Sequence, residues 1–180
     1  MSIFVNKPVI VREVFADNLE YEFMLIRSAL YNYSFVSMDT EFPGTIFKSE
    51  KRFVQLGNPE VNYRFMKVNV DALKIIQLGL TLSDSDGNLP DFGTPFCYIW
   101  EFNFKDFDIE KDHYDKESIE LLKRQEKVAK TLNVARVARL SHQAGSDSLL
   151  ILHCFMQIKN AKAFKQCNQK LPALALYGLV

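Results

Sequence analysis

Cysteine, glycine and proline are all scarce in this sequence. Its 180 residues include only 3 cysteines, and Cys97, Cys154 and Cys167 form no Cys-x-x-Cys pair. An odd number of scattered cysteines argues against a disulfide scaffold and a cysteine-rich zinc site, and favours a reducing intracellular compartment. With 7 glycines and 6 prolines, the chain is neither collagen-like nor of low complexity.

Long hydrophobic runs are missing as well. The longest apolar stretch, residues 149–156, is short and contains His153, so we expect no membrane-spanning segment. The first 15 residues show no basic flank followed by a long apolar run, so we expect no secretory signal.

Net charge is also absent, but the charges are unevenly distributed. The 22 basic and 22 acidic side chains give a formal net charge of +0. Residues 1–125 hold 20 acidic and 14 basic side chains, whereas residues 126–180 hold 2 acidic and 8 basic ones. Two interpretations stay open: the basic part attracts a polyanion, or it is the solvated face of a helix.

What is present is enough apolar surface for one globular domain. Apolar residues make up 48% of the chain and aromatic residues 13%, which supports a sizeable core. Apolar positions at three- and four-residue steps predict helices over residues 19–30 (capped by Asp17 or Asn18), 63–74, 118–134 and 147–164. Short apolar runs next to turn signals predict strands over residues 35–42, 75–82 and 97–104. This order predicts a mixed α/β or α+β domain.

One of seven pairs of acidic residues spaced two apart stands out by its setting. Asp39 and Glu41 lie in an otherwise apolar predicted strand, where alternate side chains share one face. Two like charges on such a face require compensation, and Mg²⁺ or Mn²⁺ prefers carboxylate oxygens. The alternative, that both acids face solvent at the end of the strand, stays open.

A second candidate group lies in residues 141–150, Ser-His-Gln-Ala-Gly-Ser-Asp-Ser-Leu-Leu. Asp147 falls in the first turn of a predicted helix, and His142 precedes it in a loop. A carboxylate at this position is also a common helix cap, and loop histidines usually have no catalytic role. The residues alone therefore leave two interpretations open: a functional site, or a helix cap preceded by an ordinary loop histidine.

Several long segments, taken together, resemble one protein family. They are DTEFPG (39–44), NVDALKIIQLGLTLSDSDGNLP (69–90), IWEFNF (99–104), SIELLKRQ (118–125), HQAGSDSLL (142–150) and LYGL (176–179). They are similar to the CCR-four-associated factor one family, above all to plant members. That family supplies the DEDD-type, poly(A)-specific 3′-exoribonuclease of the CCR–NOT complex, found in nucleus and cytoplasm. The resemblance implies a ribonuclease H-like α/β fold, in which helices flank a mixed sheet.

The resemblance also implies roles for four residues. Asp39 and Glu41 match the first metal-binding motif of the family, and Asp147 matches its last metal-binding aspartate. His142 matches a histidine thought to assist the attacking water. The implied cofactors are two Mg²⁺ or Mn²⁺ ions, and the implied partners are poly(A) RNA, the CCR–NOT scaffold and a companion deadenylase subunit.

The sequence departs from the family pattern near residue 125. Relatives carry a middle section with another metal-binding aspartate, but here Gln125 is followed directly by a segment that matches a later part of the family. We therefore expect residues 1–180 to form a single truncated domain with an incomplete sheet, exposed apolar surface and a weakened second metal site. Because that ion helps to stabilise the leaving group, we expect severely reduced or absent turnover. A catalytically silent CCR–NOT-binding module and a decayed product without a stable fold stay open as alternatives.

Overall fold

The computed structural model describes residues 7–47, 59–120 and 143–160. The elements follow the chain in the order β1 (Val9–Val14), α1 (Leu19–Ala29), β2 (Phe35–Glu41), α3 (Pro59–Ala72), β3 (Gln77–Ser83), β4 (Cys97–Asn103) and α5 (Ala144–Asn160). Residues 116–120 are also helical. None of the described helices combines the length and the hydropathy needed to cross a membrane.

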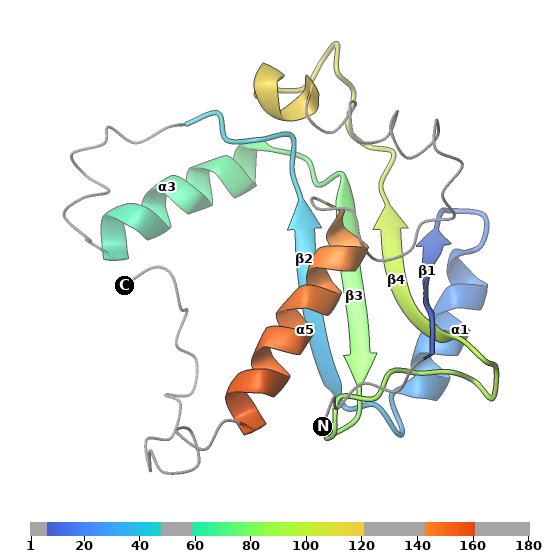
Figure 1. Cartoon of the computed structure of the whole chain (residues 1–180). Helices are drawn as coiled ribbons and strands as arrows, with labels where there is room; N and C mark the ends of the chain where they lie inside the picture. Colours follow the sequence, from blue (N-terminus) through green and yellow to red (C-terminus); the bar gives the residue numbers. More distant parts are fainter. Residues whose placement is uncertain (1–6, 48–58, 121–142, 161–180) are drawn as a thin grey trace.

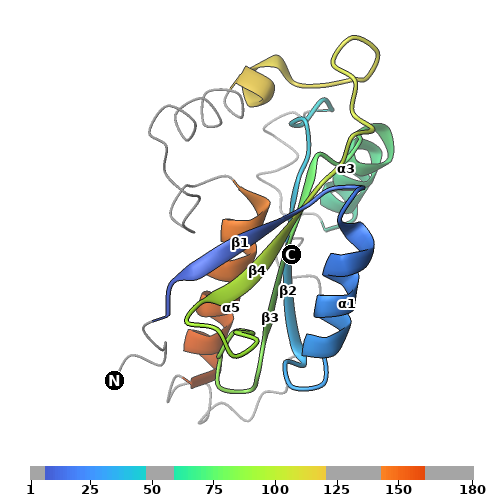
Figure 2. The ribbon, with the colours of Figure 1, turned by 90° about the vertical axis from the view of Figure 1, so that its right-hand side faces the viewer.

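The strands form one mixed sheet in the order β1-β4-β3-β2. β1 runs parallel to β4, whereas β3 is antiparallel to both β4 and β2. α5 crosses one face of this sheet and α1 covers the opposite face, as Figures 1 and 2 show from perpendicular directions. A mixed sheet flanked by helices confirms the expected α/β class.

The core has two layers, one on each face of the sheet. The cluster under α1 contains Val14, Ile26, Ala29, Leu82, Trp100 and Phe102. The cluster under α5 contains Leu89, Cys97, Ile99, Leu149, Leu152 and Met156. Because successive side chains of β4 alternate between these clusters, this strand is buried on both faces and anchors the sheet.

A partly buried ion pair ties α1 to the sheet. Nε and Nη2 of Arg12 donate to the two carboxylate oxygens of Glu22 at 2.6 and 2.7 Å. The indole nitrogen of Trp100 donates to the same carboxylate at 3.1 Å. Glu22 is only 3% exposed, so these bonds offset the unfavourable burial of its charge.

The structure corrects several predicted boundaries. β1 was not predicted, and α3 begins at Pro59 rather than Tyr63 because the fixed φ of proline suits the first turn of a helix. Asn18 stands at the start of α1 without a side-chain cap. Its side chain instead binds the turn before the helix, accepting from the amide of Phe15 and donating to the carbonyl of Glu13. The point at which the sequence departs from the family pattern, between residues 125 and 126, lies outside the described residues.

Candidate metal centre

Three carboxylates from two distant parts of the sequence meet beside the sheet. Asp39 and Glu41 belong to β2, and Asp147 belongs to the first turn of α5. One ligand oxygen from each lies within 4.8 Å of the others, and all three residues are partly buried. This spacing and this set of oxygen ligands fit a single Mg²⁺ or Mn²⁺ ion.

The extended backbone of β2 explains why two of the carboxylates point the same way. Ser37, Asp39 and Glu41 alternate with exposed residues along the strand, so their side chains share a face. Ser37 identifies that face, because its hydroxyl donates to the carbonyl of Ser148 in α5 at 2.7 Å. The two acids of β2 therefore face the helix that carries the third.

Two hydrogen bonds to Ser148 hold α5 against the sheet next to Asp147. Besides the bond from Ser37, the hydroxyls of Ser148 and Thr81 lie 2.8 Å apart. The Ser148 hydroxyl donates to the carbonyl of Gly145 at 2.8 Å, so Thr81 is left to donate to Ser148. Ser37 and Thr81 are paired across β2 and β3, and together they fix the rotation of α5 about its axis.

Close contact between backbones brings α5 down to the level of the carboxylates. Gly79 of β3 is paired with Asp39 in the sheet register. A Cβ atom at Gly79 would lie 1.7 Å from the carbonyl oxygen of Ala144. Only a residue without a side chain allows the first turn of α5 to sit this close to β3, so Gly79 helps to bring Asp147 near the acids of β2.

The electrostatics of the group favour a cation. Partial burial, and then the negative charge of Asp147, raise the pKa of Asp39 above its ordinary value. A hydrogen bond from the backbone amide of Thr40 has the opposite, weaker effect on this pKa. A bound divalent ion compensates both unfavourable effects, because it neutralises neighbouring carboxylates and replaces their lost hydration.

The sequence analysis selected the three carboxylates as candidate ligands, but it did not select the residues that position them. The structure brings Asp39, Glu41 and Asp147 together, whereas the predicted catalytic residue His142 lies outside the described residues. Ser37 and Thr81 were missed. Both are polar residues flanked on either side by apolar ones in their strands, and a polar residue at a buried strand position is a usable signal of such a contact.

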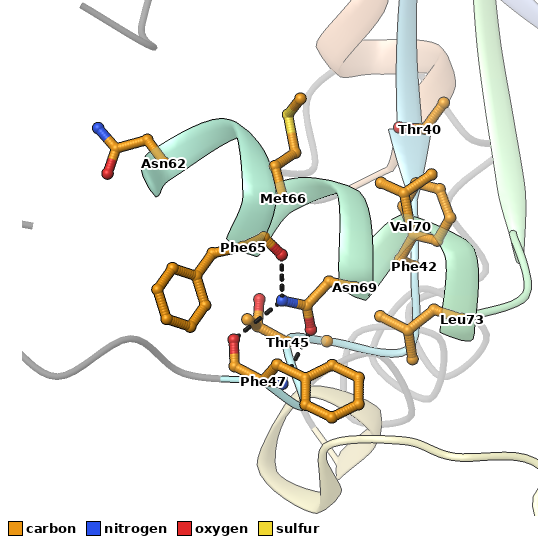
Figure 3. A pocket seen from close by; sticks show the side chains of 11 residues that line it. Thr40, Phe42, Thr45, Phe47, Asn62, Phe65, Met66, Asn69, Val70 and Leu73 are labelled. Atoms are coloured by element: carbon orange, nitrogen blue, oxygen red, sulfur yellow. Dashed lines mark hydrogen bonds between the residues drawn. The ribbon is translucent and has the colours of Figure 1, made fainter. Parts of the chain in front are cut away.

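A cavity of about 500 Å³ lies on the other side of β2, between its end and α3. Figure 3 shows the rings of Phe42, Phe47 and Phe65 around it. Thr40 also lines the cavity, and because it alternates with Asp39 and Glu41 it projects from the opposite face of β2. The cavity is therefore separate from the carboxylate group.

Asn69 of α3 builds one wall of that cavity. Its side-chain oxygen accepts from the amides of Ile46 and Phe47, both at 2.9 Å. Its nitrogen donates to the carbonyls of Phe47 and Phe65, also at 2.9 Å. Asn69 thus uses its hydrogen-bonding capacity to join the segment after β2 to α3, as Figure 3 shows.

The chain is similar to known ribonucleases in sequence. A family model described as CAF1 family ribonuclease matches residues 14–126. Two Arabidopsis thaliana proteins, probable CCR4-associated factor 1 homologs 10 and 7, are 44% and 50% identical over 142 and 125 residues. These matches cover 76% and 68% of this chain, but only 50% and 45% of the relatives.

A fungal relative shows the same partial coverage. Poly(A) ribonuclease pop2 of Schizosaccharomyces pombe is 45% identical over 112 residues, which is 62% of this chain and 31% of that protein. The chain therefore spans half the length or less of these curated relatives. The family resemblance read from the sequence is confirmed, including its likeness to plant members.

Solved structures confirm the fold. The S. pombe Pop2p structure in its Mg²⁺- and Mn²⁺-bound form gives a TM-score of 0.67 at 26% identity, covering 88% of this chain and 95% of that one. CAF1 co-crystallised with the yeast NOT1 MIF4G domain gives a TM-score of 0.56 at 25% identity, covering 83% and 88% of the two chains. The expected ribonuclease H-like α/β fold is therefore borne out.

Proposed function

Because the chain belongs to the CAF1 family of ribonucleases, we propose that its carboxylate group is a metal-dependent 3′-to-5′ exoribonuclease site for poly(A) RNA. The observation that carries this proposal is the meeting of Asp39, Glu41 and Asp147 within 4.8 Å of one another. Support comes from one relative described as a poly(A) ribonuclease and from a structural neighbour that binds Mg²⁺ and Mn²⁺.

The proposed roles of the residues follow from their geometry. A divalent ion at such a site polarises a phosphoryl oxygen and lowers the pKa of a water molecule. Asp39, Glu41 and Asp147 supply the oxygen ligands, and Ser148 holds Asp147 in place through its bonds to the sheet. By resemblance, His142 assists the attacking water.

We further propose that catalysis by this chain is strongly impaired. The family's middle section, with its additional metal-binding aspartate, is not found in the sequence between Gln125 and the matching segment that follows. The family-model match ends at residue 126, next to the proposed junction, which supports a single truncated domain. A second ion would keep only Asp39 as a shared protein ligand, and Mg²⁺ binds weakly with so few ligands.

An oligoadenylate assay tests the activity. The full chain is incubated with Mn²⁺ and a 5′-labelled oligoadenylate, next to the Asp39→Ala variant and the exposed-site control Glu60→Gln. We expect a ladder of products at a rate about 100-fold or more below that of a full-length relative, because loss of several kcal/mol of charge stabilisation costs at least two powers of ten. The ladder should vanish in Asp39→Ala and persist in Glu60→Gln.

Two outcomes would count against this proposal. Intact substrate at high protein concentration would refute the proposed catalysis by this chain. A ladder of products that persists in Asp39→Ala would show that a contaminating nuclease cleaves the substrate. Oligocytidylate and oligouridylate of equal length test the base preference. Equal cleavage of the three oligonucleotides would refute the proposed specificity for poly(A).

The second candidate function is a catalytically silent module that binds the CCR–NOT scaffold. The absent metal-binding aspartate favours it, and the similarity to CAF1 co-crystallised with a NOT1 domain supports scaffold binding. Pull-down with the MIF4G domain of NOT1 tests this role, with a full-length relative as the positive control. Binding by the relative but not by this chain would contradict it.

Two further expectations from the resemblance belong to the same proposal. The companion deadenylase subunit should be recovered with the chain when it is isolated from cells. A fluorescently tagged chain should be found in both nucleus and cytoplasm.

A further inference from the structure

A fourth carboxylate lies beneath the start of α5, outside the metal group. Glu101 of β4 is only 1% exposed. Its Oε2 atom accepts a hydrogen bond from the backbone amide of Gly145 at 3.2 Å. Its Oε1 atom accepts from the side-chain amide of Gln77 at 3.3 Å. A buried carboxylate that bonds a helix amide and a side-chain amide has its charge compensated by these donors.

The sheet register places Glu101 in the same row as the metal group. Asp39 pairs with Gly79 across β2 and β3, and Gly79 pairs with Glu101 across β3 and β4. The side chains of Asp39 and Glu101 therefore project from the α5 side of the sheet, on either side of Gly79. The absence of a side chain at Gly79 leaves room between the two acids, and the first turn of α5 fills it.

The amide that Glu101 binds belongs to the first turn of α5. Amides at a helix N-terminus have no partner within the helix, and the helix dipole favours a negative charge there. Gly145 precedes Asp147 by two residues, and Ser148 follows it by one. Glu101 thus fixes the helix from β4 on one side of Asp147, while Ser37 and Thr81 fix it from β2 and β3 on the other.

We propose that Glu101 is a positioning residue for the metal centre. By accepting the Gly145 amide, it holds the first turn of α5 at the height and rotation at which the carboxylate of Asp147 faces Asp39 and Glu41. Glu101 itself does not belong to the group of ligand atoms within 4.8 Å. This inference rests on the proposed metal-dependent function and deepens it by adding a residue that acts through the helix.

Two substitutions distinguish the effect of the length of the Glu101 side chain from the effect of its charge. Glu101→Gln keeps the length and an acceptor oxygen but removes the charge, whereas Glu101→Asp keeps the charge but is one methylene shorter. Ile26→Val, in the core cluster on the opposite face of the sheet, is the control for a loss of packing. Each variant of the full chain is titrated with Mn²⁺ by electron paramagnetic resonance. Hydrogen exchange of residues 143–148 is measured separately in EDTA.

We expect the two glutamate variants to differ in Mn²⁺ binding and in hydrogen exchange. Glu101→Asp should weaken Mn²⁺ binding about tenfold or more, the usual effect of losing a group that orients a ligand, and should speed exchange at the start of α5. Glu101→Gln should lose clearly less of both than Glu101→Asp, because its amide oxygen still reaches and accepts from the Gly145 amide. Ile26→Val should lower the melting temperature without changing either measurement.

Three results would overturn the inference: unchanged Mn²⁺ binding in Glu101→Asp, equal losses in both glutamate variants, or a comparable loss in Ile26→Val. A different result would show that the proposed metal site itself is wrong: Asp39→Ala would then bind Mn²⁺ as strongly as the natural chain. In that case hydrogen exchange decides the role of Glu101. Faster exchange in Glu101→Asp alone supports the positioning of α5, and unchanged exchange refutes it.

Discussion

At the scale of single residues, the pKa of Asp39 links the metal centre to stability. Burial and the charge of Asp147 raise this pKa, so the folded chain binds the proton of Asp39 more tightly than the unfolded chain does. Ionisation of Asp39 therefore lowers the free energy of unfolding as the pH rises through the native pKa. At neutral pH and without a metal ion, the charge of Asp39 opposes folding.

Replacing Asp39 with asparagine should have opposite effects with and without metal. In EDTA at pH 7, Asp39→Asn should raise the free energy of unfolding by about 0.2–1 kcal/mol, the range for partly exposed charge pairs. With Mn²⁺ at about 100 times its dissociation constant, the natural chain should gain about 2.7 kcal/mol, and Asp39→Asn should gain little. Thermal melts with both additions measure this, and an equal Mn²⁺ response in both proteins would contradict the assignment.

His153 of α5 should make the fold sensitive to mild acid. Burial lowers the pKa of its imidazole, so the unfolded chain binds the proton more readily than the folded chain does. The stability that the neutral imidazole contributes is therefore complete above the unfolded value of about 6.5 and is lost as the pH falls through the native pKa. The acid side of the stability profile should steepen in that range.

Melting curves of His153→Gln between pH 5 and 8 test this dependence. Glutamine does not titrate, so the drop in melting temperature below about pH 6.5 should be smaller than in the natural chain by about 2 °C, the shift expected from a fraction of a kcal/mol. His113→Gln, at an exposed position, is the matched control for the loss of a histidine. A profile that His153→Gln leaves unchanged would show that other groups cause the acid sensitivity.

At the scale of elements, the docking of α5 on β3 depends on Gly79. A methyl group there would meet backbone atoms of Ala144 and Gly145, which cannot rotate away as a flexible side chain would. Gly79→Ala should therefore push α5 off the sheet, lower the free energy of unfolding by about 2–3 kcal/mol and abolish Mn²⁺ stabilisation. Denaturant titrations with and without Mn²⁺ measure both effects.

Ser83 provides a matched control on the same strand. Its buried hydroxyl has no hydrogen-bond partner among the described atoms, so Ser83→Ala removes an unsatisfied polar group and should leave the free energy of unfolding unchanged or raise it. If Gly79→Ala were equally harmless, the close approach of α5 to β3 would not be required for the fold or for the metal site.

The strands that carry the site could be predicted from the sequence, whereas the contacts between them could not. β2, β3 and β4 follow short apolar runs that end at turn residues. β1 was missed although Val-Ile-Val-Arg-Glu-Val is rich in β-branched residues, because an edge strand with a polar end gives a weak pattern. Alternation predicted the shared face of Asp39 and Glu41, but their meeting with Asp147 depends on tertiary packing that no local pattern encodes.

At the scale of the whole molecule, β2 forms one edge of the described sheet and carries exposed apolar side chains. Val36 is 51% exposed and Met38 is 59% exposed, and both lie on the face opposite the carboxylates. An edge strand with apolar side chains is a template for pairing with another chain. We therefore expect this edge to drive self-association of the purified chain.

A lysine at Met38 tests that expectation. Met38→Lys places a charge on the exposed face of β2, where an added chain would have to bury it. It should suppress concentration-dependent light scattering while changing the free energy of unfolding by less than about 0.5 kcal/mol, as expected for a surface substitution. Leu150→Lys adds the same charge at a position on α5 that is also 59% exposed. If both variants suppress scattering equally, net charge explains the effect; suppression by Met38→Lys alone assigns self-association to the edge of β2.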